Sequence, residues 1–294
     1  METCSGTADT ADIADTAGDL AGRAVELRAL SLAADFAACV ELQLATWGRS
    51  FAEAVPGSIL KICQKVGGVA AGAFDRDGHL LGFVFGLTGV RGGRLVHWSH
   101  MLAVAPGARD LGLGTRLKFF QRDLLRKLGV ESVLWTYDPL EARNAHLNLN
   151  RLGAEVAEYV EDMYAGEMGS DLASGIGTDR FIVDWRIDGD LVRPARRDAA
   201  FLSAPSIGVK AGVGIGMEAG VANAASPLPE TPRVRVEVPA SIQDLKVERP
   251  EEAVAFRAVT RRAFEHYLGT GYRVTAFYRD GETGRCFYGL ERGK

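Results

Sequence analysis

The chain has 294 residues, 47% of them hydrophobic and 24% charged, which is typical of a globular protein with one large or two modest domains. Its formal net charge of −4 excludes the basic surface of a nucleic-acid-binding protein, and no apolar run approaches the roughly 20 residues that span a bilayer. The amino terminus lacks the basic and then apolar order of a signal peptide, so we expect a cytoplasmic protein without nucleic-acid or membrane partners. The four cysteines are scattered without metal-ligand spacing, and we expect no metal.

Composition divides the chain into four parts. Residues 1–22 are rich in Ala, Asp, Thr and Gly and cannot bury enough surface to offset chain entropy, which predicts a disordered tail. Residues 198–232 are dominated by Gly, Ala, Ser and Pro, which predicts a linker or an exposed insertion. The remaining parts are expected to fold as a larger domain over 23–197 and a small C-terminal α/β module over 233–294.

Strand and helix patterns alternate in chain order through the larger domain. Val69–Phe74 and Leu80–Leu87 are apolar runs joined by the turn sequence Asp-Arg-Asp-Gly, which predicts a hairpin. The other strands are expected at Val25–Leu30, Leu95–Val104, Val130–Thr136, Ala154–Val160 and Arg180–Ile187, and the helices at Ala33–Leu44, Ser58–Val66, Thr115–Leu128 and Ala142–Leu152.

The C-terminal module shows a strand, a helix and a hairpin. Val234–Val238 is the predicted strand, and Pro250–Leu268 is the predicted helix, whose first turn of Pro, Glu and Glu suits a helix start. Tyr272–Tyr278 and Cys286–Leu290 predict the hairpin.

The most informative segment joins a predicted strand to a predicted helix, from Leu102 to Gly114, with the sequence Leu-Ala-Val-Ala-Pro-Gly-Ala-Arg-Asp-Leu-Gly-Leu-Gly. Gly112 and Gly114 remove side chains where the backbone turns sharply, which leaves amide N–H groups able to point at an anion. The helix that begins near Thr115 adds the positive end of its dipole. The turn therefore suits a pyrophosphate, although a glycine turn that only reverses the chain is the alternative.

Two stretches of this sequence resemble the signatures of one superfamily. The turn has neither the GxGxxG spacing of a dinucleotide-binding fold nor the GxxxxGK[ST] spacing of a P-loop. It has Arg-x-x-Gly-x-Gly from Arg109, after a strand that ends Leu-Ala-Val-x-Pro, and it resembles the acyl-CoA signature of GNAT acyltransferases. Asn144 to Ala154, a helix that starts with Asn and ends in Leu-Gly, is similar to their second signature. The resemblance implies an α/β fold with a mixed, mostly antiparallel central sheet flanked by helices.

The resemblance also implies a cofactor site. Acyl-CoA, with an acetyl or succinyl group, would be the cosubstrate, its pantetheine arm pairing with the strand that ends at Val104 and its pyrophosphate meeting the turn amides. No metal is implied. The cofactor-binding residues implied in this way are Leu102, Ala103, Val104, Arg109, Asp110, Leu111, Gly112, Leu113, Gly114, Thr115 and Asn144.

A narrower resemblance concerns the substrate. His100–Val104, Trp135–Leu140, Asn148 and Thr178–Arg180 resemble a largely uncharacterised GNAT subfamily of about this length, some of whose members are linked with N-succinylation of amino acids. This implies direct transfer of the acyl group to a small amine such as an amino acid. A peptide or protein N-acetyltransferase, a non-catalytic CoA-binding sensor and an unrelated nucleotide-binding domain are the alternatives. The oligomeric state is open, with a homodimer as one option.

Candidate catalytic residues follow from the chemistry of aminolysis. His100 is the candidate base because its pKa naturally lies near working pH and the matching strand borders the amine in GNAT enzymes; a buried or solvated strand histidine is the alternative. Strand parity decides whether His97 or His100 faces the cleft. The tyrosine that protonates the leaving thiolate in many GNAT enzymes corresponds here to Leu149. Further candidates for proton transfer or hydrogen bonding are Tyr137, Asp138 and Asn148.

Two arginines are candidates for binding a substrate carboxylate. The guanidinium groups of Arg143 and Arg180 present paired N–H donors that match a carboxylate. Surface solvation is the alternative for each arginine, and Asp179 with Arg180 is also consistent with an exposed strand start. Asp138 is likewise consistent with a turn before Pro139.

Overall fold

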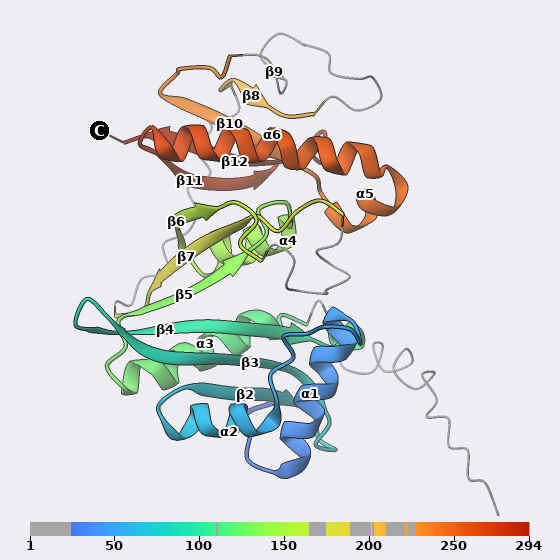
Figure 1. The fold of residues 1–294 in the computed structure, drawn as a ribbon, viewed down its shortest axis with the longest axis vertical. Coiled ribbons are helices and arrows are strands. Elements are labelled where there is room, and N and C mark those ends of the chain that lie inside the picture. The colour runs from blue at the N-terminus through green and yellow to red at the C-terminus, as the bar shows by residue number, and fades with distance from the viewer. Residues whose placement is uncertain are drawn as a thin grey trace, which may run out of the picture. The chain divides into compact units, whose positions relative to one another are not determined.

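The computed structural model describes residues 25–109, 111–164, 175–188, 201, 203–209, 221–222 and 227–293. The chain divides into two compact units, each described by itself (Figure 1). The first comprises Met1–Arg49, Ala54–Val90 and His97–Gly129, and the second comprises Ser50–Glu53, Arg91–Val96 and Val130–Lys294. The predicted tail over 1–22 lies outside the described residues. Among those residues, no helix is both long and apolar enough to span a membrane.

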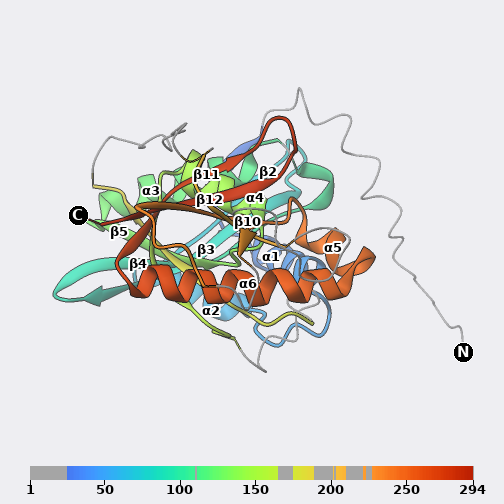
Figure 2. The ribbon, with the colours of Figure 1, turned by 90° about the horizontal axis from the view of Figure 1, so that it is seen from above.

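The first unit is built on four neighbouring strands, in the order β1-β2-β3-β4. The predicted hairpin is confirmed, since β2 and β3 pair antiparallel, as do β1 and β2. Every residue of β2 is buried, because helices cover both faces: α1 and α2 lie on one and α3 on the other (Figures 1 and 2). The bounds are β1 Glu26–Ala29, α1 Ala33–Trp47, α2 Gly57–Lys65, β2 Val69–Phe74, β3 Leu80–Arg91, β4 Arg94–Val104 and α3 Leu113–Lys127.

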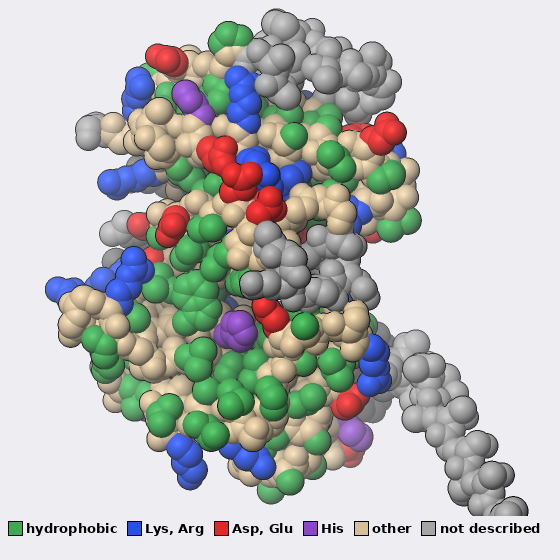
Figure 3. All heavy atoms as spheres, in the orientation of Figure 1, with side chains coloured by type: hydrophobic (Ala, Val, Ile, Leu, Met, Phe, Trp, Pro, Cys, Tyr) green, Lys and Arg blue, Asp and Glu red, His purple; other side chains and the backbone are tan. Residues whose placement is uncertain are grey.

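The helix α2 carries apolar side chains on two faces. Leu60 and Cys63 are buried, whereas Ile59, Ile62 and Val66 are exposed. Figure 3 shows hydrophobic side chains gathered over the face of the first unit that α1 and α2 cover. Exposed apolar side chains grouped in this way are typical of a surface that meets a ligand or a partner.

The second unit begins with three antiparallel strands in the order β5-β7-β6. They are β5 (Ser132–Tyr137), β6 (Glu155–Val160) and β7 (Arg180–Arg186). The helix predicted over 142–152 is present in two parts, α4 (Ala142–Ala145) and a π-helical segment, His146–Arg151. A π-helical segment is rare and occurs often near functional sites.

A second sheet of the order β11-β12-β10-β8-β9 completes this unit. The predicted strand, long helix and hairpin are confirmed, and α6 lies along one face of the sheet (Figures 1 and 2). The short helix α5 was not predicted, and β8 lies inside the segment expected to be a linker. The bounds are β8 Ser206–Ile207, β9 Val221–Ala222, β10 Arg233–Val238, α5 Ile242–Glu248, α6 Pro250–Gly269, β11 Tyr272–Arg279 and β12 Cys286–Arg292.

Aromatic side chains join the two sheets of the second unit. Phe181 of β7 packs 4.7 Å from Phe264 of α6 and 5.5 Å from Tyr288 of β12, measured between ring centres. All three rings are fully buried. The C-terminal module therefore shares its core with the strands β5, β6 and β7. The predicted class, an α/β fold with a mostly antiparallel sheet flanked by helices and a small C-terminal module, is confirmed.

Candidate functional site

The turn after β4 leads into α3 through a left-handed glycine. A 3₁₀ turn over Pro106–Ala108 follows the strand, and Gly112 precedes the helix with φ of 69° and ψ of 13°. Residues other than glycine rarely adopt this left-handed backbone conformation, which explains the glycine at this position. Among the described residues, no side chain caps the start of α3. The first amide N–H groups of the helix are therefore suited to an anionic ligand, and the predicted phosphate site at this turn stays a prediction.

Most of the predicted cofactor residues lie on β4, in this turn or at the start of α3. Leu113 is buried and, with Leu117, anchors α3 on the sheet, whereas Gly114 and Thr115 are half-buried and Arg109 is exposed. On the strand, Ala103 is buried, and Leu102 and Val104 are half-buried on the opposite face; Leu111 is also half-buried. Asp110 lies outside the described residues, and Asn144 is exposed on α4 in the second unit.

The two strand histidines lie on opposite faces of β4. His97, Ser99, Met101 and Ala103 form the buried face, which packs on α3. His100 is half-buried on the other face, where its ring meets Phe85 edge-on, with ring centres 6.1 Å apart. The sequence left open which of the two histidines shares a strand face with Leu102 and Val104. The structure shows that His100 does and that His97 does not.

His97 belongs to a buried chain of hydrogen bonds between β4 and α3. Lys118 Nζ donates to Ser99 Oγ at 2.8 Å, and that hydroxyl donates to Gln121 Oε1 at 2.9 Å. The Gln121 amide nitrogen lies 3.0 Å from His97 Nε2, and His97 Nδ1 lies 2.9 Å from Thr88 Oγ1.

One orientation satisfies every member of this chain. Thr88 Oγ1 donates to the carbonyl of Gly67 at 2.6 Å, so it accepts from His97 Nδ1–H, and His97 Nε2 accepts from Gln121. His97 is therefore a neutral imidazole with a fixed tautomer. Its pKa is lowered to about 3, first by burial and then by Lys118. These groups tie α3 to β4, and none of them is available as a base.

Lys118 itself is a buried amine, and burial lowers its pKa to about 7. The unfolded chain holds the Lys118 proton up to an ordinary pKa of about 10.4, so between pH 7 and that value the unfolded state binds more protons than the folded state. The contribution of Lys118 to the free energy of unfolding should therefore rise with pH across this window, by up to about 1.4 kcal/mol per pH unit.

We expect Lys118→Met to remove this contribution, because the variant lacks the amine that loses its proton on folding. Urea unfolding at several pH values between 7 and 10 measures the slope. Lys127→Met, at the exposed end of the same helix, is the matched control and should keep the wild-type slope. An equal slope in both variants would contradict the interpretation.

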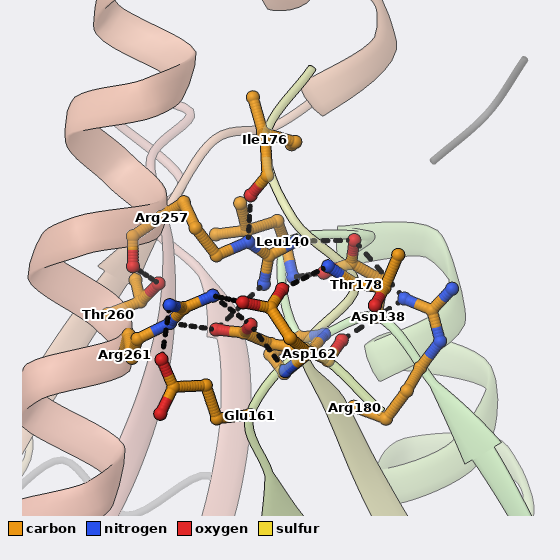
Figure 4. Close-up of polar contacts among 12 residues, drawn as sticks. Asp138, Leu140, Glu161, Asp162, Ile176, Thr178, Arg180, Arg257, Thr260 and Arg261 are labelled. Atoms are coloured by element: carbon orange, nitrogen blue, oxygen red, sulfur yellow. Dashed lines mark hydrogen bonds and ion pairs between the residues drawn. The ribbon is translucent and has the colours of Figure 1, made fainter. Parts of the chain in front are cut away.

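In the second unit, Asp138 is the centre of an ion-pair cluster (Figure 4). It follows β5, and its Oδ1 accepts the Leu140 N–H at 2.8 Å. Its Oδ2 accepts from Arg257 Nη2 of α6 at 2.6 Å and lies 3.6 Å from Arg180 Nη1. Both oxygens of this carboxylate are therefore engaged.

Arg180, the first residue of β7, lies beside Asp138 with its side chain 12% exposed. Its Nη1 donates to the carbonyl of Asp179 at 3.1 Å, and its guanidinium lies 5.4 Å from the centre of the Tyr164 ring. A guanidinium has five N–H donors, and the contacts within the described residues leave most of them without a hydrogen bond. Arg180 is thus suited to bind an anionic ligand group. Arg143 is exposed on α4, and no described contact joins it to Asp138.

The other catalytic candidates are buried and engaged. The hydroxyl oxygens of Tyr137 and Tyr288 lie 3.3 Å apart, and Tyr288 donates to the carbonyl of Pro139 at 2.9 Å. Burial raises the pKa of Tyr137 well above its ordinary value, so this phenol stays neutral. Asn148 is buried, and its amide oxygen accepts from Trp135 Nε1 at 3.2 Å. Leu149 is buried too.

Sequence reasoning missed the arginines of α6. Arg257 and Arg261 are one helical turn apart and contact residues at the ends of β5, β6 and β7. Their spacing beside the buried Phe264 was the available signal, since a polar pair inside an apolar helix face predicts buried partners. Asp179, which was consistent with an exposed strand start, is fully buried: it accepts hydrogen bonds from Arg261 and Tyr159.

Comparison with known proteins gives structural likenesses only. No family model matches the chain, and no curated protein matches it in sequence. A putative acetyltransferase of Salmonella typhimurium, solved with acetyl-CoA, is 17% identical with a TM-score of 0.45, covering 59% of this chain and 99% of its own. The ribosomal-protein-S18-alanine N-acetyltransferase of Escherichia coli is 18% identical with a TM-score of 0.44, covering 58% and 98%.

A third solved structure is described as a putative acetyltransferase of the GNAT family from Desulfovibrio desulfuricans. It is 17% identical with a TM-score of 0.43, and the match covers 56% of this chain and 99% of that one. At such identities and TM-scores the function has to be argued from the residues of this chain.

Proposed function

We propose that the chain is a GNAT-type N-acyltransferase, which transfers an acyl group from acyl-CoA to the nitrogen of a small amine that carries a carboxylate. The uncapped start of α3 behind the left-handed Gly112 is the observation that carries the proposal. It presents amide N–H groups and a helix dipole together, as binding of a pyrophosphate requires. Within the described part of the chain, no side chain caps these amides, and no atom lies within 4 Å of a Cβ placed at Gly112.

The strand β4 and the turn before α3 would bind the thioester and carry out its aminolysis. In aminolysis the amine nitrogen attacks the carbonyl carbon, a C–N bond forms, the C–S bond breaks, and one proton moves from nitrogen to sulfur in the net reaction. His100 would take the amine proton, because it shares a strand face with Leu102 and Val104 and His97 does not. A backbone N–H of β4 near Leu102 would stabilise the oxyanion.

Arg180 is the proposed binding residue for the carboxylate of the acceptor. Arg180 keeps N–H donors available beside Asp138, and its guanidinium matches a carboxylate such as that of an amino acid. An acetyl or a succinyl group is consistent with this assignment. A peptide or protein acceptor is a competing proposal, which the choice of amines in the assay below tests.

A CoA-binding sensor without activity is the second candidate function. One observation favours it: the position expected to hold the thiolate-protonating tyrosine is the buried Leu149, and the phenol of Tyr137 is buried against Tyr288. A sensor would bind acyl-CoA without turning it over.

Release of free CoA thiol from acetyl-CoA and succinyl-CoA tests these proposals. We expect release that depends on an added amine, strongest for L- or D-amino acids and weaker for the matching amines without a carboxylate. Acyl-CoA binding without release across the panel would favour the sensor or a macromolecular acceptor. Failure to bind any acyl-CoA would exclude the proposed function.

A further inference from the structure

Two arginines of α6 form hydrogen bonds and ion pairs with residues at the ends of three strands in the second unit (Figure 4). Arg257, 4% exposed, donates from Nη2 to Asp138 after β5 and from Nε to the carbonyl of Ile176 before β7, at 2.6 and 3.1 Å. One turn later, Arg261 donates from Nε to Asp179 at 3.0 Å and from Nη1 to Glu161 after β6 at 2.5 Å. A single helix of the C-terminal module thus holds the end of β5 and both described ends of the β6–β7 connection.

The backbone of this connection adopts conformations that need such support. Asp162 has φ of 42°, which is unusual for a residue other than glycine, and its Oδ1 accepts the Thr178 N–H at 2.8 Å. Gly177 has φ of 80°, and a Cβ there would lie 2.6 Å from Asp162 Oδ1 and 3.0 Å from Arg261 Nη2. Strained backbone persists where the surrounding contacts hold it and is common at binding sites.

A buried guanidinium such as that of Arg257 costs free energy of folding, and packing of α6 against the strands does not need one. Among the described residues, Arg257 Nη1 is buried without a hydrogen-bond partner, and it lies 3.7 Å from Asp179 Oδ2. Buried ion pairs are often replaced by apolar side chains without loss of stability, and the rings of Phe181, Phe264 and Tyr288 already supply an apolar contact between the same elements. A buried nitrogen without a hydrogen bond therefore points to a role other than packing.

The distances around Asp138 indicate that role. Arg257 makes the short contact to Asp138 Oδ2 at 2.6 Å, and Arg180 lies farther away at 3.6 Å from the same oxygen. Because Arg257 already balances this carboxylate, Arg180 is held nearby while most of its N–H donors make no hydrogen bond within the described residues. If Arg257 were lost, Asp138 would close on Arg180 as a paired carboxylate and guanidinium, and those donors would be used up.

We infer that Arg257 is a positioning residue for the acceptor: by occupying Asp138, it leaves Arg180 able to bind the carboxylate of the amine substrate. The C-terminal module thereby sets acceptor affinity through α6. This inference rests on the proposed function and assigns it one substrate class, amines that carry a carboxylate.

Steady-state kinetics of Arg257→Gln test the inference. The KM for the carboxylate-bearing amine should rise about 10- to 100-fold, the range expected when a charge-assisted hydrogen bond is lost. The affinity for acyl-CoA should stay within about twofold, since the variant leaves the turn before α3 intact. The KM for the amine in Arg257→Lys, which keeps the charge, should lie between the values of the wild type and Arg257→Gln. Arg249→Gln, which removes an exposed ion pair with Glu252 at the start of α6, is the control and should match the wild type.

The double variant Arg257→Gln with Asp138→Asn separates positioning from general structural damage. Removing the charge of Asp138 should free Arg180 again and return the KM for the amine toward the wild-type value, whatever happens to kcat. An unchanged KM in Arg257→Gln, or a double variant with a KM no better than the single one, would overturn the inference while the proposed function stands. Absence of turnover by the wild type with every amine would overturn the proposed function, and the inference with it.

Discussion

Gly112→Asp is expected to abolish binding of acyl-CoA. The substitution places a carboxylate at the start of α3, where the amides and the helix dipole would otherwise meet the pyrophosphate, and two anions cannot share that position. We expect an affinity loss of about 100-fold or more, since a like charge placed at a charged contact costs several kcal/mol. Isothermal titration with CoA and acetyl-CoA measures it.

Two control variants isolate the charge. Gly112→Asn has nearly the same shape and the same left-handed backbone requirement, so it should lose much less affinity than Gly112→Asp. Gly129→Asp places the same residue at a second left-handed glycine, φ of 77°, beyond the other end of α3, and should bind acyl-CoA normally if it folds. Equal affinity for Gly112→Asp and Gly112→Asn would place the cofactor phosphates elsewhere.

His100→Gln is expected to lower turnover by about 100-fold while the affinity for acyl-CoA changes little, because general-base catalysis contributes roughly 10²- to 10⁴-fold. The variant should also lose the fall in kcat/KM at low pH that a protonated base imposes in the wild type. The measurement is the pH–rate profile of both proteins with the best amine. His79→Gln, on the exposed β2–β3 turn, should behave as wild type. A low-pH limb that is unchanged in His100→Gln would remove His100 from the role of base.

Much of the fold could be predicted because its elements are regular in sequence. The hairpin of β2 and β3 follows from two apolar runs around Asp75–Gly78. The helix α3 was predicted from the helical spacing of Leu117, Phe120, Leu124 and Leu128, but its buried face runs instead through Leu113, Leu117 and Leu125. The turn at Gly112 was found for a local reason as well. A backbone that must turn left-handed before a helix requires glycine, and this requirement is visible in the sequence.

The parts that escaped prediction depend on contacts between distant residues. Strand β8 has only two residues, Ser206 and Ile207, and is defined by pairing with β10 rather than by its own pattern. The role of Arg257 depends on Asp138, which lies 119 positions away in sequence. Strand alternation places His97 and His100 on opposite faces of β4, but which of them packs on α3 depends on a chain of buried hydrogen bonds that has no local signature.

The aromatic contacts around Phe181 also decide where this protein can be divided. A gene fragment that stops at residue 197 would contain the strand with Phe181 but neither Phe264 nor Tyr288, and two buried aromatic contacts of Phe181 would be replaced by water. The exposed rings would favour aggregation of such a fragment during expression. Recombinant fragments, fusions and truncation libraries should therefore not be cut within residues 130–293.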